Sequence, residues 1–193
     1  MDTASNCKQL PHFIQLYAAW TSDIMIPSQL PGITPFIADA VVFSLGLGGE
    51  TGEVVDELFQ FQQNPIGYQM DNVRKEHGDA MFYWVSLALL LGFEVLSLYE
   101  AEPLASIDEL KLTEISDQLV IAAGLVQEAC KKYVRDANLD RAKFHRGLVL
   151  FAKSWRELCL LLKFNPAHIL AKNKRKAEGR QARGTLRGSG NNR

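Results

Sequence analysis

The chain has 193 residues, enough for one substantial domain or two small ones, and its 47% hydrophobic and 22% charged residues are ordinary for a globular protein. Three scattered cysteines argue against a disulfide framework and favour a reducing cytosol. The first residues lack the pattern of a signal peptide, and the longest apolar run, 81–93, is shorter than the ~20 residues that span a bilayer. We therefore expect a cytoplasmic protein that does not enter a membrane.

Charge is divided unevenly along the chain, although the net charge is only −1. Residues 172–193 hold eight basic residues and one acidic residue, a net charge of +7, which leaves −8 for the rest of the chain. The acidic body disfavours nucleic acid as a partner. Salt-dependent DNA binding through the basic segment is the alternative, and truncation at Ala171 would test it.

Apolar residues recur at helical spacing along most of the chain, and the alternation typical of strands is absent. The first helix is expected to begin near Pro11, a favourable residue for a first turn, and to end before the breaker segment 26–35. A capping box at Ser106 and Glu109 is expected to open the fourth helix. We therefore predict an all-α helical bundle, with helices near residues 11–24, 36–62, 71–99, 106–134, 141–163 and from 166 onward.

Two segments of the chain resemble each other at an offset of 71 residues. The decapeptides WVSLALLLGF (84–93) and WRELCLLLKF (155–164) agree at six of ten positions, including the aromatic residues at both ends. A weaker match aligns 49–53 with 124–128. We therefore predict two related helical hairpins, the second degenerate. The expected division is an N-terminal helix with a catalytic hairpin (1–105), the degenerate hairpin (106–171) and a basic C-terminal helix or tail (172–193).

Four carboxylates lie at helical spacing in the first predicted hairpin. Glu50 and Glu53 share one helix face, and after 22 residues the same spacing recurs at Glu76 and Asp79. Four unpaired carboxylates that converged in an antiparallel hairpin would force at least one of them to protonate. A divalent cation removes this conflict, and ligands that offer only oxygen favour Mg²⁺, with Mn²⁺ as a substitute, over Zn²⁺. We therefore predict a site for two or more such ions.

Two other interpretations of these acids are weaker. A solvated acidic face is the usual explanation of a single Glu-x-x-Glu, but here two such pairs are flanked by glycines and adjoin apolar segments. A di-iron carboxylate bundle requires Glu-x-x-His on two helices. In this sequence His77 directly follows Glu76, and no histidine stands three residues after a glutamate, so the di-iron pattern is not met.

The segment GLGGETGEVVDEL (46–58), followed by VRKEHGDAMFYWVSLALLLGF (73–93), closely resembles the MazG-like family of all-α nucleoside triphosphate pyrophosphohydrolases. The family pattern is Glu-x-x-Glu, a spacer of one or two dozen residues, and Glu-x-x-Asp. The resemblance implies that the glycines let helices approach closely and that the four acids hold Mg²⁺ over a triphosphate. Glu53 is the candidate for orienting the attacking water. Some relatives have an acid directly before the first motif glutamate, where this chain has Gly49, so a separate general base stays unassigned.

On a helix, four residues of the basic segment would share one face, namely Asn173, Lys176, Arg180 and Arg183. Such a face suits a polyphosphate, because arginine binds phosphate oxygens bidentately and lysine acts as a point charge. MazG-like proteins often end in this way, with a last segment like 183–193, which implies contacts of these four residues with sugar and phosphates. Here the second hairpin intervenes, so the tail reaches the acids either within the chain or in a neighbouring subunit. The resemblance also implies a homo-oligomer, a dimer or tetramer.

The resemblance implies an enzyme that cleaves a nucleoside triphosphate between its α and β phosphates, giving a nucleoside monophosphate and pyrophosphate. Mg²⁺ would activate a water for in-line attack, and the basic residues would stabilise the leaving pyrophosphate. Trp20 and Ile24, one helical turn apart, are candidates to sandwich the nucleobase, with core packing as the alternative. Resemblance to phage-type members favours a purine deoxynucleotide such as dGTP. The alternatives are a dUTP, dCTP or broad house-cleaning enzyme, and a catalytically inactive helical nucleotide-binding or regulatory module.

Overall fold

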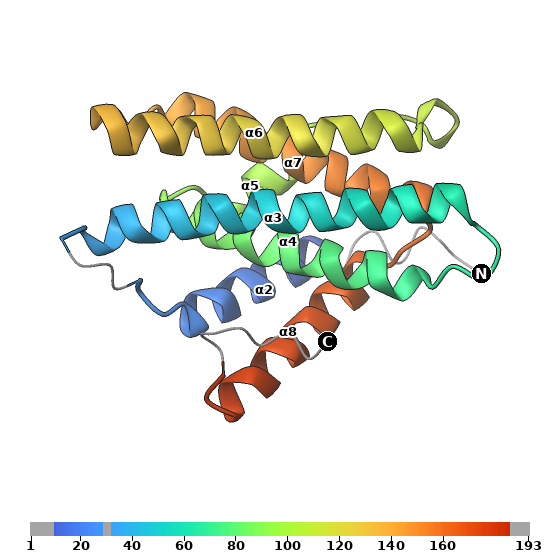
Figure 1. Ribbon diagram of the computed structural model, residues 1–193, viewed down its shortest axis with the longest axis horizontal. Helices are drawn as coiled ribbons and strands as arrows, with labels where there is room; N and C mark the ends of the chain where they lie inside the picture. The colour runs from blue at the N-terminus through green and yellow to red at the C-terminus, as the bar shows by residue number, and fades with distance from the viewer. Residues whose placement is uncertain (1–9, 29–31, 186–193) are drawn as a thin grey trace.

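The computed structural model describes residues 10–28 and 32–185, and all the regular structure in these ranges is helical. Seven α-helices and one 3-10 helix occur there, with no strand, which confirms the predicted all-α class. None of the described helices is long and apolar enough to cross a membrane. In chain order the helices (Figure 1) are α2 (Leu10–Ile24), α3 (Pro35–Gln63), α4 (Met70–Leu90), α5 (Val95–Glu100), η1 (Ile107–Glu109), α6 (Leu112–Asp136), α7 (Arg141–Leu161) and α8 (Pro166–Ala182).

Two long helix pairs form the frame of the molecule, α3 with α4 and α6 with α7. Figure 1 shows α3 and α6 side by side along the length of the molecule, and these two helices are in contact. The shorter helices α2 and α8 pack on α4, whereas α5 packs on α7. Helix α8 follows the second pair in the chain and therefore crosses back to the first pair. This crossing brings the basic segment to the acidic hairpin.

Two tryptophans that are fully buried join α4 to α7. Trp84 Nε1 donates a hydrogen bond to the Leu148 carbonyl oxygen at 2.8 Å, and Trp155 Nε1 donates to the His77 carbonyl oxygen at 2.9 Å. A buried indole N–H requires a partner, and each tryptophan finds it on the opposite helix. The two bonds are reciprocal, because each reaches the carbonyl seven residues before the other tryptophan. These two bonds fix the position of α4 relative to α7 in the core.

The helix predicted over 71–99 is two helices, so its prediction as one element was wrong. Helix α4 ends at Leu90, and Gly92 then takes a positive φ of 67°, a conformation that glycine adopts without steric cost. Glu94 restarts the chain as α5, since its side chain accepts hydrogen bonds from the amides of Leu96 (3.1 Å) and Ser97 (2.5 Å). The break between α4 and α5 was not predicted because the apolar run is continuous there. A single glycine does not change the helical periodicity of such a run.

The predicted capping box at Ser106 and Glu109 is present, but it caps the 3-10 helix η1. Helix α6 begins three residues later, at Leu112. The motif therefore identified a helical turn correctly and assigned it to the wrong helix. A capping box specifies the local hydrogen bonds of one turn and does not determine how far the helix continues.

Two glycines of the acidic segment allow close packing, as expected. A Cβ atom added to Gly46 would overlap the Tyr83 ring on α4, and one added to Gly48 would overlap the Gln127 side chain on α6. Gly49 and Gly52 differ, because a Cβ atom on either would meet no atom within 4 Å. Half of the glycines in this segment therefore lie against side chains of neighbouring helices, and the other half face open space.

Candidate functional site

Three of the four predicted acids converge between α3 and α4. Glu50 on α3 and the pair Glu76 and Asp79 on α4 each offer a carboxylate oxygen, and these oxygens all lie within 4.8 Å of one another. The i, i+3 spacing places both α4 acids on the face toward α3, since residues three apart on a helix are neighbours. We call Glu50, Glu76 and Asp79 the acidic triad.

Glu53 lies one turn after Glu50 and lines the same cavity, but its side chain is exposed and its oxygens are not part of the 4.8 Å cluster. The structure therefore distinguishes this acid from the triad. Its exposed place at the rim leaves it accessible to water. The predicted roles of Glu53 as a metal ligand and as the acid that orients water stay predictions.

The triad is electrostatically strained in the absence of a cation. Burial, reinforced by the neighbouring carboxylates, raises the pKa of Glu50 to about 8. Burial also raises the pKa of Glu76, although Lys75 opposes that shift. A donor set of three carboxylate oxygens, without nitrogen or sulfur, fits the preference of Mg²⁺ and Mn²⁺. A divalent cation would favour the charged forms of Glu50 and Glu76 by supplying positive charge next to them.

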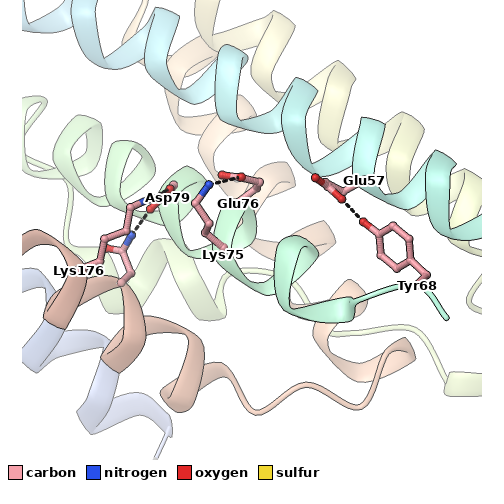
Figure 2. Close-up of polar contacts among 7 residues, drawn as sticks. Glu57, Tyr68, Lys75, Glu76, Asp79 and Lys176 are labelled. Carbon is pink, nitrogen blue, oxygen red and sulfur yellow. Dashed lines mark hydrogen bonds and ion pairs between the residues drawn. The ribbon is translucent and has the colours of Figure 1, made fainter. Parts of the chain in front are cut away.

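The basic face of α8 lies directly over the triad. Asn173 Nδ2 donates a hydrogen bond to Asp79 Oδ1 at 2.5 Å, and Lys176 forms an ion pair with Asp79 Oδ2 (Figure 2). Arg180 lines the same cavity one turn further along α8. Within this one chain, then, the tail reaches the acids by crossing back from the second hairpin, which favours the first of the two predicted routes.

Arg183 is the fourth residue of the predicted stripe, and it lies apart from the other three. It is the exposed C-cap residue of α8 and is not among the residues that line the cavity. The predicted contact segment 183–193 lies mostly outside the described residues, which end at 185. Contact of this segment with substrate stays a prediction.

Sequence reasoning missed several residues of the site. Lys75 Nζ pairs with Glu76 Oε1 at 2.7 Å, which Figure 2 shows beside the Lys176 pair. Phe82 and Tyr83 line the cavity and supply its aromatic wall. They follow Asp79 by three and four positions, so the helical period would have placed them on the same face. No comparable signal was available for Lys75, which directly precedes a triad acid.

The two residues predicted to sandwich a base belong to the hydrophobic core. Trp20 and Ile24 are 9% and 7% exposed, and neither is among the residues that line the cavity. Trp20 contacts Phe82 edge-on, with ring centroids 6.4 Å apart, so it lies behind the aromatic wall. This placement accords with the core-packing alternative, while a role in base binding stays a prediction.

The resulting cavity has a volume of about 160 Å³ and is open to solvent. Its lining combines acids from α3 and α4, bases from α4 and α8, and one aromatic wall: Glu50, Glu53, Lys75, Glu76, Asp79, Phe82, Tyr83, Asn173, Lys176, Ala177 and Arg180. Such a site can hold a cation and an anion side by side.

Comparison of the chain with models of known protein families, with curated proteins and with solved structures finds no match.

Proposed function

We propose that the protein is a Mg²⁺-dependent nucleoside triphosphate pyrophosphohydrolase of the MazG-like all-α family, cleaving between the α and β phosphates. One observation supports this proposal above the others. The acidic triad of the α3–α4 hairpin and the basic face of α8 line one solvent-open cavity. A metal-bound polyphosphate requires this combination, because its cation needs oxygen ligands and its phosphates need positive charge.

In this proposal the acidic triad holds the metal. When bound, Mg²⁺ neutralises phosphate charge and lowers the pKa of a coordinated water. Glu53, exposed at the rim of the cavity, is our candidate for orienting the attacking water. Its solvent exposure leaves the carboxylate accessible to a water molecule, which it could orient by accepting a hydrogen bond.

The two site lysines would exchange partners when substrate binds. Lys75 is paired with Glu76, and Lys176 with Asp79, so both triad acids of α4 have a lysine as counterion. A cation would take over the carboxylates and release the lysines to the phosphates. Arg180 lines the same cavity and can bind phosphate oxygens bidentately. Cation and polyphosphate would then bind cooperatively. The cation would neutralise the carboxylates that lose their lysine partners, and the phosphates would pair with the released lysines.

The aromatic wall is the proposed contact for the nucleobase. Phe82 and Tyr83 line the cavity next to Asp79, and a base stacked on such rings gains about 1–3 kcal/mol. A dNTP panel therefore reports both the base preference and the reaction. Our first candidate is a purine deoxynucleotide such as dGTP, with dUTP, dCTP or several dNTPs as the alternative.

We further propose that the two hairpins descend from one ancestral hairpin by internal duplication. Helices α4 and α7 both have 21 residues and begin 71 positions apart. Their ends match at the same offset: Phe93 N donates to the Ala88 carbonyl oxygen at 2.9 Å, and Phe164 N to that of Cys159 at 2.8 Å. The residue before each phenylalanine has a positive φ in both cases. The reciprocal tryptophan bonds obey the same offset.

Only the first hairpin would be active. At the positions that correspond to Glu76 and Asp79, the second hairpin has Gly147 and Leu150. A Cβ atom on Gly147 would lie 2.8 Å from Val126 Cγ2, so α7 approaches α6 too closely there for a glutamate. The second hairpin has therefore lost both the acids and the space for them, and it serves to support the first.

The proposal is tested by incubating the protein with each dNTP and Mg²⁺ and separating the products by ion exchange. We expect a nucleoside monophosphate and pyrophosphate in equal amounts. Release of single phosphates would contradict the proposed cleavage position. A Mg²⁺-dependent rise in melting temperature on nucleotide binding without turnover would instead favour the inactive binding module.

A further inference from the structure

A line of two hydrogen bonds connects three helices through the site. The Tyr17 hydroxyl on α2 donates to Asn173 Oδ1 on α8 at 2.5 Å, and Asn173 Nδ2 donates to Asp79 Oδ1 on α4 at 2.5 Å. Both links are shielded from solvent, since Tyr17 is 2% and Asn173 is 8% exposed. The first and the last of the described helices, α2 and α8, are therefore linked to one acid of the triad.

Chemistry allows only one direction for this line of bonds. An ionised aspartate can only accept, so the amide nitrogen of Asn173 must face it. The amide oxygen of Asn173 then points the other way, toward the tyrosine, and this oxygen requires a donor. The Tyr17 hydroxyl supplies that donor. Burial and the charge of Asp79 raise the pKa of Tyr17, which keeps the hydroxyl protonated.

Helix α8 packs closely on α4, so the short side chain of Asn173 can reach Asp79. A Cβ atom on Gly78 would lie 3.1 Å from Asn173 Cβ and 3.3 Å from Ile169 Cγ2. Gly78 directly precedes Asp79, so its lack of a side chain lets α8 approach α4 next to this acid. A larger residue at this position would push the asparagine away from the carboxylate.

We propose that Tyr17 and Asn173 are positioning residues for Asp79. Asn173 holds Oδ1, Tyr17 holds Asn173 in the orientation that permits this, and Oδ2 is the oxygen presented to a divalent cation. Lys176 pairs with Oδ2 and is the group that a bound cation would displace. Asn173 is thereby assigned a role in orienting a metal ligand, which uses its Oδ1 and one of the two N–H groups of Nδ2. The inference rests on the proposed cation site and is independent of which nucleotide is cleaved.

The test measures Mn²⁺ affinity of the full chain by electron paramagnetic resonance without nucleotide. Residues that orient metal ligands typically change metal affinity by 10–100-fold, so we expect Tyr17→Phe to weaken Mn²⁺ binding about tenfold. Asn173→Ala, which removes both hydrogen bonds, should weaken it at least as much. In the Asn173→Ala background, Tyr17→Phe should add no further loss, because the tyrosine acts only through the asparagine.

Tyr68→Phe is the matched control. Its hydroxyl donates to the carboxylate of Glu57, an acid outside the triad (Figure 2), so its removal deletes a comparable bond elsewhere. We expect wild-type Mn²⁺ affinity in this variant. Circular dichroism establishes that each variant is folded, and Asn173→Ala provides a second measurement should Tyr17→Phe lower stability.

The outcomes separate this inference from the proposed function. Unchanged Mn²⁺ affinity in folded Tyr17→Phe would show that the tyrosine only supports the fold, and would overturn the inference alone. Additive losses in the double variant would overturn it as well, since they would mean that Tyr17 acts by another route. A wild-type protein that binds no Mn²⁺ would remove the cation site itself and the inference with it.

Discussion

The α3–α4 and α6–α7 hairpins have closely similar frames but differ in the chemistry of their inner faces. Both end their second helix with the same backbone hydrogen bonds, and each contributes one buried tryptophan to the other. In the first hairpin, however, burial and the neighbouring carboxylates raise the pKa of Glu50 to about 8, which is a cost to folding above its ordinary pKa. The second hairpin has no such cost, because Leu125, Gly147 and Leu150 stand at the positions that correspond to the three acids. The acidic triad is therefore confined to one of two hairpins whose frames are alike, so the frame itself does not require these acids.

The largest expected effect comes from a matched pair of substitutions in the two hairpins. Glu53→Gln should lower turnover by about 10²–10⁴-fold, because it removes the acid proposed to orient water. Glu128→Gln changes the aligned acid of the second hairpin, which pairs with Lys131 on the surface, and should leave turnover unchanged. Both variants should remain folded, since neither side chain is buried. Steady-state hydrolysis of the preferred nucleotide measures the difference, and equal effects would contradict the assignment of activity to the first hairpin.

Substituting the two reciprocal tryptophans tests whether both hairpins contribute equally to the free energy of unfolding. Trp84→Phe and Trp155→Phe each remove an indole N–H from a buried carbonyl and leave a small void, so each should lower the free energy of unfolding by about 2 kcal/mol. Urea unfolding of the two variants measures the losses. Similar values would support equal roles, whereas a loss confined to one of them would show that one hairpin alone determines the core.

A smaller effect is expected from pH in the absence of divalent cations. In the folded protein Glu50 stays protonated up to about pH 8, whereas in the unfolded chain it ionises near its ordinary pKa of 4.5. The unfolded state therefore binds fewer protons between these values, and this group makes stability fall as pH rises from 4.5 to 8. Glu50→Gln should remove that part of the slope. Thermal unfolding in EDTA across this range measures it, and an unchanged slope in the variant would exclude Glu50 as the cause.

How much of this site the sequence predicts depends on whether a residue acts within one helix or between helices. The acids and the stripe of α8 follow from helical spacing, so they were predictable, as was the all-α class. The partnership of Tyr17 with Asn173 joins residues 156 positions apart, and no local pattern reports such a contact. The break between α4 and α5 was missed for a different reason, because Gly92 and the cap at Glu94 act on backbone geometry within an apolar run.

The smallest expected effects concern two aligned glycines that face open space. A Cβ atom on Gly49 or on Gly124 meets nothing within 4 Å, so alanine at either position should add about 0.5–1 kcal/mol to the free energy of unfolding through helix propensity. Gly46→Ala should instead destabilise, because its Cβ atom would displace the Tyr83 ring. Thermal or urea unfolding ranks the three variants. Loss of stability on Gly49→Ala alone would reveal a contact at this face that the single chain does not contain.

The central claim is that the α3–α4 hairpin supports attack of water on the α-phosphorus of a bound triphosphate. Hydrolysis in water enriched in ¹⁸O, with Mg²⁺ and the preferred dNTP, followed by mass spectrometry of both products, tests this claim most directly. We expect one ¹⁸O atom in the nucleoside monophosphate and none in pyrophosphate. Label in pyrophosphate, or in released single phosphate, would contradict it.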